Sequence, residues 1–354
     1  MTPSVPPSEM KKIRRQPVWA RALHRQLAAL TRGAMKSGRQ ALGLALKTKR
    51  TAVQRSARPL SQGAQAPAQA SAPGSWLSGK TQGLGGTRHY KLYRPPGLKA
   101  GEQLPLLVML HGCGQTADSF AASTRMNHCA QRERFLVLYP EQDRLANAQG
   151  CWNWFDTASG RAQAEAALLV QAVLQVCRLY PVDRARIAVA GLSAGASMAA
   201  LMATLHPGHF KALVMHSGVP PGSAHSTLTA LTAMRGRQRA APLPATGQPW
   251  PPLLVIHGSA DAVVAPVNGR VAVQRWAHNA GAQAAAPRRV QRGQRHPMLV
   301  TDFKHRSHTV ATLVAVQGLA HAWSGGLASL AFGDAKGPDA SCMVWAFVAR
   351  QFAA

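Results

Sequence analysis

A serine flanked by two glycines, Gly191-Leu192-Ser193-Ala194-Gly195, lies between a short apolar run and a stretch rich in Ala and Met. The apolar run covers 186–190, and the second stretch, 196–205, is compatible with a helix. A strand, Gly-x-Ser-x-Gly and a helix in this order are typical of a sharp turn that exposes the serine hydroxyl. The first N–H groups of such a helix face the negative charge that develops during nucleophilic attack. The pattern therefore predicts Ser193 as a catalytic nucleophile.

A serine hydroxyl is a weak nucleophile at neutral pH, so it needs a general base and a group that orients this base. In enzymes with this kind of serine turn, an acid and then a histidine follow the serine along the chain. Asp261 lies in the turn after the apolar run 252–257, and His321 lies in the loop after the last expected strand. We predict Asp261 as the orienting acid and His321 as the general base.

For each of these two roles, the chain offers alternatives in less suitable places. They are Asp302, Asp334 and Asp339 for the acid, and His257, His296 and His308 for the base. None of these acids directly follows an apolar run after the serine turn. Two of the histidines lie at the end of an expected strand or just before one, rather than in a loop at the sheet edge.

The tetrahedral intermediate of such a reaction needs at least two N–H donors for its oxyanion. One is expected from the backbone of Ala194, directly after the nucleophile. The other is expected from the loop His111-Gly112-Cys113-Gly114-Gln115, with Cys113 as the donor residue. Glycines in this loop let the backbone approach the substrate closely.

From about residue 88, apolar runs typical of strands alternate with patterns typical of helices. The expected strands are 88–94 at an edge, 104–111, 135–139, 186–190, 210–216, 252–257 and 309–316. The expected helices include 118–134, 161–180 and 338–352. This alternation predicts an α/β fold with a mostly parallel central sheet and helices on both faces. Residues 218–250 are interpreted as an insertion over the edge where the strands end, which is where such folds bind ligands.

The net charge of +28 is concentrated in the N-terminal part of the chain. Residues 1–80 contain 15 Lys and Arg and one acidic residue, Glu9. We interpret 1–57 as a basic extension whose leucine spacing fits an amphipathic helix, 58–86 as a flexible linker, and 87–354 as the catalytic domain. No stretch has the apolar length of a membrane span, and five cysteines are too few for a disulfide scaffold.

Motifs spread over 88–352 resemble the esterase family of short-chain polyhydroxyalkanoate (PHB) depolymerases, whose members have the α/β-hydrolase fold. These motifs are His111-Gly112-Cys113 with Gln115, Ser123-Thr124-Arg125-Met126-Asn127, Tyr139-Pro140-Glu141-Gln142, Cys151-Trp152-Asn153-Trp154-Phe155, the serine pentapeptide, Gly258-Ser259-Ala260-Asp261, His321-Ala322-Trp323-Ser324-Gly325-Gly326 and Gly337-Pro338-Asp339-Ala340-Ser341. The resemblance implies a triad of Ser193, Asp261 and His321, in agreement with the chain order.

This resemblance also implies an activity. It indicates a serine esterase that hydrolyses ester bonds in polymers or oligomers of 3-hydroxyalkanoates, such as poly(3-hydroxybutyrate), through an acyl-enzyme. Related sequences act as feruloyl or acetyl-xylan esterases, so a carbohydrate esterase is the alternative. This chemistry requires no cofactor and no metal.

Aromatic and cysteine residues near the expected site suggest two further features. Trp152, Trp154 and Trp323 are candidates for lining an apolar substrate groove, with core packing as the alternative for each. Cys113 and Cys151 lie in two loops that both belong near the catalytic edge. We therefore hypothesise a disulfide that pins the oxyanion loop to the Trp loop.

The basic extension is expected to bind an anionic surface, such as a polymer granule or a membrane, while its leucines enter the apolar phase. Nucleic acid is the rival partner, which we do not expect, and a solvated tail is the third interpretation. The resemblance favours an extracellular location, whereas no apolar segment typical of a secretory signal follows the basic start. The sequence leaves the location open between extracellular and cytoplasmic or granule-associated.

Overall fold

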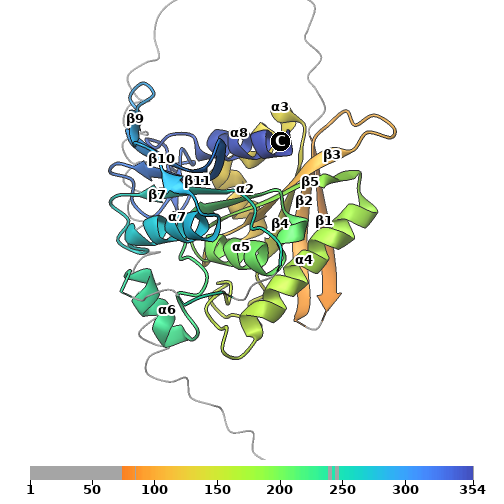
Figure 1. Cartoon of the computed structure of the whole chain (residues 1–354). Helices are drawn as coiled ribbons and strands as arrows, with labels where there is room; N and C mark the ends of the chain where they lie inside the picture. Colours follow the sequence, from red (N-terminus) through yellow and green to blue (C-terminus); the bar gives the residue numbers. More distant parts are fainter. Residues whose placement is uncertain (1–73, 84, 238–240, 244–246, 354) are drawn as a thin grey trace, which may run out of the picture.

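An eleven-stranded sheet runs through the computed structural model, with helices on both of its faces (Figure 1). The structure describes residues 74–83, 85–237, 241–243 and 247–353. The predictions for 1–73, which include the basic extension and most of the linker, lie outside these residues. Among the described residues, no helix has the length and apolar character needed to cross a membrane.

The main sheet has the strand order β1-β2-β4-β3-β5-β6-β7-β11-β10-β8, and β9 also pairs with β10. The bounds are β1 Ser75–Gly83, β2 Gly86–Arg94, β3 Leu104–Leu110, β4 Leu136–Glu141, β5 Val182–Leu192, β6 Ala212–His216, β7 Leu253–Gly258, β8 Gln283–Ala284, β9 Arg288–Val290, β10 Met298–His305 and β11 His308–Val316. Six adjacent central strands are parallel to one another, in the order β4, β3, β5, β6, β7 and β11. All pairings outside this group in the main sheet are antiparallel. The short strands β12 (Trp323–Ser324) and β13 (Gly333–Asp334) form a separate pair. The prediction of a mostly parallel central sheet is confirmed.

The helices form a layer on each face of this sheet. Their bounds are α2 Ala117–Thr124, α3 Met126–Glu133, α4 Arg161–Leu179, α5 Ala194–Leu205, α6 Thr227–Met234, α7 Val267–Asn279 and α8 Ala340–Phe352, with a 3-10 turn at Pro207–His209. Helices α4, α5 and α7 pack on one face, and α2, α3 and α8 pack on the other (Figure 1). The predicted coverage of both faces is therefore confirmed.

Strand β3 shows why the sequences of the central strands are apolar without interruption. Leu106 and Val108 belong to the core under α4, α5 and α7, whereas Leu107 and Met109 belong to the core under α2, α3 and α8. Side chains alternate between the two faces of a strand, so a strand covered on both sides must be apolar at every position. Because β5, β7 and β11 are parallel, the loops that follow them meet at the same edge of the sheet.

Strand β1 lies in the segment that we expected to be a flexible linker, so that prediction is wrong for 75–83. The strand pairs with β2 along its whole length, which places β2 inside the sheet rather than at its edge. The folded unit therefore begins before residue 87. A Cβ atom at Gly79 would lie only 2.3 Å from the ring of Tyr90. Glycine in β1 thus makes room for a packed ring and does not mark a linker.

Two other elements differ from expectation. The single helix expected over 118–134 is broken into α2 and α3 at Arg125, whose φ of 55° is left-handed. This turn lets the Arg125 guanidinium donate a hydrogen bond to the carbonyl of Gly325, 2.9 Å away. Strand β10 was not expected, and it pairs with β11 beyond the parallel part of the sheet.

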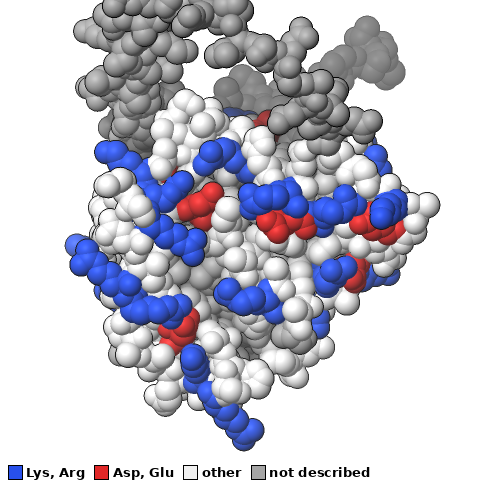
Figure 2. Space-filling model, turned by 90° about the horizontal axis from the view of Figure 1, so that it is seen from above, with Lys and Arg blue, Asp and Glu red and all other residues white. Residues whose placement is uncertain are grey.

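The basic excess extends to the surface of the described part. On the face seen in Figure 2, acidic side chains lie beside Lys or Arg, and further basic side chains have no acidic neighbour there. Surface ion pairs include Arg132 with Glu133 and Arg134 with Glu102. Exposed pairs of this kind contribute about 1 kcal/mol or less, so the fold depends on its core.

We predict that a chain beginning at Gly86, which lacks β1, is less stable than one beginning at Gly74. Trp76 of β1 packs on Tyr139 with ring centroids 5.4 Å apart, and its indole donates to Asp118. Exposing this surface should cost at least about 3 kcal/mol in free energy of unfolding and at least about 6 °C in Tm. Thermal unfolding of the two chains measures the difference, and equal Tm values would contradict the role assigned to β1.

Candidate active site

Ser193 occupies a strained turn between β5 and α5. Its φ of 56° and ψ of −120° are rarely adopted by residues other than glycine. The Ser193 N–H donates to the carbonyl of His216 at 2.8 Å, which fixes the turn to the neighbouring strand β6. A Cβ atom at Gly195 would lie 2.2 Å from the carbonyl oxygen of Leu110, so glycine allows α5 to start directly against the end of β3. This arrangement has the geometry of a turn that exposes a nucleophile.

The structure brings the three predicted residues Ser193, His321 and Asp261 into one hydrogen-bonded chain. The Oγ atom of Ser193 lies 2.9 Å from Nε2 of His321. The Nδ1 atom of His321 lies 2.8 Å from Oδ2 of Asp261. Because the carboxylate accepts a hydrogen bond from the protonated Nδ1, Nε2 carries a lone pair that can accept the serine proton. The three side chains come from the loops after β5, β11 and β7.

The carboxyl group of Asp261 is buried and surrounded by donors. Its Oδ1 atom accepts hydrogen bonds from the backbone N–H groups of Val263 and Val264, at 3.0 and 2.9 Å. Burial by itself would raise the pKa of Asp261, but hydrogen bonds with His257 and His321 outweigh it and hold the pKa well below its usual range. Asp261 is therefore ionised and able to orient His321.

The alternatives for acid and base have other contacts. His257 lies on the acid, with Nε2 3.5 Å from Oδ2 of Asp261 and 2.9 Å from the carbonyl of Val264. The remaining alternatives lie elsewhere in the fold. Asp302 accepts hydrogen bonds from Arg288 and Thr312, and Asp334 lies beside His296. Asp339 caps α8, and His308 is the exposed first residue of β11. Of these candidates, only Asp261 and His321 belong to the hydrogen-bonded chain that reaches Ser193.

A cavity of about 310 Å³ opens beside Ser193 and His321. Its lining is mostly apolar. One wall contains Trp154, Phe155 and the Cys113–Cys151 pair, and α6 supplies another with Ala230, Leu231 and Met234. The expected insertion 218–250 thus contributes to the pocket through α6. The sequence pattern gave no signal for which of its residues would do so.

The two residues predicted to donate backbone N–H groups to the oxyanion lie at the same place. Cys113 and Ala194 both line the cavity next to Ser193. Ala194 is the first residue of α5, and the first N–H groups of a helix have no partner within the helix. Within loop 111–115, called the oxyanion loop below, the side-chain amide oxygen of Gln115 accepts a hydrogen bond from the N–H of Gly112 at 2.9 Å. This bond stabilises the conformation of the loop.

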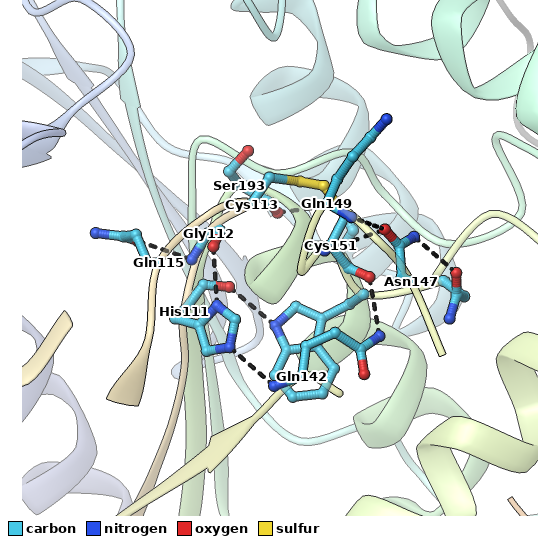
Figure 3. Close-up of a disulfide and its surroundings, with 12 residues drawn as sticks. His111, Gly112, Cys113, Gln115, Gln142, Asn147, Gln149, Cys151 and Ser193 are labelled. Atoms are coloured by element: carbon cyan, nitrogen blue, oxygen red, sulfur yellow. Dashed lines mark hydrogen bonds between the residues drawn. A yellow bond between two sulfur atoms is a disulfide. The ribbon is translucent and has the colours of Figure 1, made fainter. Parts of the chain in front are cut away.

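A disulfide joins Cys113 of the oxyanion loop to Cys151 of the Trp loop 151–155 (Figure 3). The indole N–H of Trp152 donates to the carbonyl of His111 at 2.9 Å, which adds a second link. His111 itself donates from Nδ1 to the carbonyl of Gly112 and accepts at Nε2 from the N–H of Gln142. The two loops therefore form one cross-linked wall of the cavity.

A buried carboxylate that the sequence analysis missed supports this wall. Glu165 of α4 accepts from Arg88 at 2.8 Å, from the side chain of Gln142 at 2.7 Å and from the N–H of Asn153 at 2.7 Å. The Gln142 side chain also donates to the carbonyl of Cys151 at 2.8 Å. The available signal was a charged residue among the apolar positions of an amphipathic helix, since Glu165 lies on the buried face of α4.

Of the three tryptophans predicted to contact substrate, only Trp154 lines the cavity. Trp152 and Trp323 are fully buried, so the prediction is wrong for them. Trp152 packs under Arg88, and Trp323 packs against Phe120 and His216. Their indole N–H groups have partners inside the protein, at the carbonyl of His111 and the hydroxyl of Ser341, which explains why the rings face inward.

The strand, serine turn and helix, set in this mostly parallel sheet, define an α/β-hydrolase. The sequence model of the family described as Esterase PHB depolymerase matches residues 88–296, which is more than half of the chain. The chain therefore belongs to this family, and the resemblance seen in its motifs is confirmed.

Relatives of the chain are esterases with different names. It is 34% identical to poly(3-hydroxyalkanoate) depolymerase C of Paucimonas lemoignei, over 53% of this chain and 47% of the relative. It is 28% identical to feruloyl esterase B of Neurospora crassa, over 50% of this chain and 66% of the relative. It is 27% identical to a probable acetylxylan esterase A of Aspergillus clavatus, over 52% of this chain and 65% of the relative. The chain thus spans about half to two thirds of the length of these relatives.

Solved structures have the same fold. An acetyl xylan esterase from Aspergillus awamori has a TM-score of 0.57 at 20% identity and is covered over 94% of its length, with 69% of this chain. A ferulic acid esterase has a TM-score of 0.51 at 15% identity and is covered over 99% of its length, with 79% of this chain. At these identities the likeness concerns the fold alone.

We predict that Glu165→Gln destabilises the protein far more than Glu133→Gln. Glu165 and Arg88 are both buried, so the change leaves the Arg88 charge without its partner and should cost about 3–5 kcal/mol in free energy of unfolding. Glu133 pairs with Arg132 at the surface, so its replacement should cost about 1 kcal/mol or less. Urea unfolding of both variants tests this, and similar losses would contradict it.

We also predict that acid destabilises the fold through two buried histidines. Burial lowers the pKa of His111 to about 4 and that of His216 to about 3. An unfolded chain protonates these groups near pH 6.5, so between about pH 6.5 and 4 it binds protons that the folded chain does not. The free energy of unfolding should therefore fall as the pH falls through this window.

The slope of the free energy of unfolding against pH measures how many such histidines contribute. Each histidine adds up to about 1.4 kcal/mol per pH unit. His216→Gln should reduce the slope by about one such contribution, and so should His111→Gln. Urea unfolding between pH 4.5 and 7.5 gives these slopes, and an unchanged slope in His216→Gln would refute the assignment.

Proposed function

We propose that this protein is a serine esterase with Ser193, His321 and Asp261 as its catalytic triad. The observation that carries the proposal is the hydrogen-bonded chain of these side chains, with distances of 2.9 and 2.8 Å, at the wall of an apolar cavity. Membership of an esterase family supports the same reaction. An ionised, buried Asp261 fits the role of holding His321 in the tautomer that accepts a proton at Nε2.

In the first half of the reaction, the Ser193 oxygen attacks the ester carbonyl carbon while its proton passes to Nε2 of His321. The carbonyl oxygen becomes an oxyanion and accepts hydrogen bonds from the backbone N–H groups of Cys113 and Ala194. The C–O bond to the leaving alcohol then breaks, and His321 returns the proton to that oxygen. The product of this half is an acyl-enzyme on Ser193 and a free alcohol.

In the second half, water replaces the alcohol. His321 takes a proton from the water, whose oxygen attacks the acyl carbon, and the same donors stabilise the second oxyanion. Collapse of this intermediate breaks the bond to Ser193, which regains its proton from His321. The reaction releases a carboxylic acid, which ionises in solution, and restores the enzyme.

The proposed substrates are short-chain hydroxyalkanoate esters, as polyester or as oligomers. The cavity of about 310 Å³ lies at the small end of ligand pockets, and its lining suits short aliphatic groups. The name of the relative at 34% identity supports the same class. Relatives named feruloyl and acetylxylan esterases keep a carbohydrate esterase as the alternative. The few polar groups in the lining favour the aliphatic substrate over a sugar.

We predict that Ser193→Ala loses about a million-fold in kcat on p-nitrophenyl butyrate, because it removes the nucleophile. Ser307→Ala, at an exposed turn, is the matched control and should keep the wild-type rate. Release of p-nitrophenol from each purified variant measures this. If Ser193→Ala hydrolyses the ester as fast as the wild type, the site assignment is wrong.

Assays of the wild type and of these two variants on further substrates distinguish the substrate classes. Amorphous poly(3-hydroxybutyrate) and its oligomers test the leading class, and methyl ferulate and acetylated xylan test the alternative. Hydrolysis of the hydroxybutyrate substrates with little action on the others supports the proposal. The reverse preference would retain the triad and replace the substrate.

A further inference from the structure

We propose that Arg144 binds a free carboxylate of the substrate, so that the pocket selects hydroxy-acid oligomers that end in a carboxylate over neutral esters. The inference rests on the proposed esterase function and specifies its substrate. It assigns a binding residue outside the hydrogen-bonded chain of Ser193, His321 and Asp261.

Arg144 differs in charge from everything else around the cavity. Among the described residues of the lining, it is the only Lys, Arg, Asp or Glu. It is exposed to solvent, and the next residue, Leu145, is 95% exposed, so this turn lies at the mouth of the pocket. A permanent positive charge therefore lies at the entrance to an apolar cavity.

No carboxylate of the described residues lies within ion-pair distance of Arg144. The adjacent Asp143 is used within its own turn, where Oδ1 accepts from the N–H of Leu145 at 2.8 Å. Glu165 is buried and paired with Arg88. An incoming carboxylate would thus meet a guanidinium with no internal competitor in the described part of the chain.

The backbone that carries Arg144 is fixed on both sides. The N–H of Asp143 donates to the side chain of Gln142, and the carbonyl of Asp143 accepts from the N–H groups of Ala146 and Asn147. Arg161 donates to the carbonyl of Ala146.

Asn147 extends this support toward the disulfide. Its side chain accepts from the N–H of Gln149 and donates to Asn153, close to Cys151 (Figure 3). The base of Arg144 is therefore held in place, while its side chain is left to meet a ligand.

The chemistry of the candidate substrates makes this charge selective. An oligomer of 3-hydroxy acids has one free carboxylate, at its chain end, whereas acetyl and feruloyl esters of neutral sugars have none. A guanidinium and a carboxylate form a bidentate, charge-assisted pair, for which Arg has the matching geometry. Because Arg144 is exposed, we expect a selectivity of about 10-fold, and we expect salt to weaken it.

The test compares the trimer of 3-hydroxybutyrate as free acid with its methyl ester, in which a methyl group removes the end charge. Only cleavage of the internal ester bonds, which both compounds share, is counted. We expect wild type to show kcat/KM about 10-fold higher for the acid, and Arg144→Gln to show a ratio near one. Arg144→Lys should retain part of the preference, because it keeps the charge without the bidentate geometry. Arg350→Gln, an equal charge loss at an exposed position of α8, should keep the wild-type ratio.

Since the acid-to-ester ratio is taken within each variant, general damage to the enzyme cancels. Raising NaCl to 0.5 M should reduce the ratio in wild type and leave it unchanged in Arg144→Gln. The inference is overturned if wild type shows no preference, if Arg144→Gln keeps it, or if Arg350→Gln loses it equally.

A binding measurement separates this inference from the esterase proposal. Calorimetric titration of Ser193→Ala with the two trimers needs no turnover, and the acid should bind about 10-fold more tightly. Adding Arg144→Gln to Ser193→Ala should remove the difference. If p-nitrophenyl butyrate is not hydrolysed by wild type, the esterase proposal fails while this titration still decides the role of Arg144. Equal affinity for the two trimers overturns the inference.

Discussion

The carboxylate of Glu165 accepts hydrogen bonds from three segments that are far apart in the chain, and one side of the cavity depends on it. Arg88 reaches it from β2, Gln142 from the end of β4, and Asn153 from the Trp loop. Gln142 connects Glu165 to loop 111–115, because its backbone N–H donates a hydrogen bond to His111 of that loop. Buried donors and charges are costly when unpaired, so each of these contacts supports the others.

The opposite side of the cavity is held by the sheet itself. Ser193, His321 and Asp261 follow parallel strands, so the strand register brings the loops that carry them together at one edge. Helix α6 closes the remaining side with small and aliphatic residues. The molecule thus combines a rigid sheet edge, suited to chemistry, with connecting segments whose composition sets the shape and charge of the pocket.

Much of the sheet edge could be predicted because its signals are local. An apolar run followed by a turn places Ser193 and Asp261 without knowledge of the fold. Contacts between distant segments have no such signal: Arg88 and Glu165 are 77 residues apart and meet only through the topology. The direction of a side chain is equally hidden, so the sequence motif around Trp323 does not reveal that its ring packs inward on His216.

The Cys113–Cys151 disulfide makes one wall of the pocket dependent on the redox environment. This bond is the covalent link between loop 111–115, which lines the cavity, and the loop that carries Trp154. Disulfides persist in oxidising compartments and are opened by the thiol systems of the cytosol. Reduction of this bond would leave the two loops joined by the hydrogen bond from Trp152 to the carbonyl of His111 and by the contact between these two rings. The redox state of the surroundings, as well as the sequence, therefore decides whether this wall of the pocket is covalently fixed.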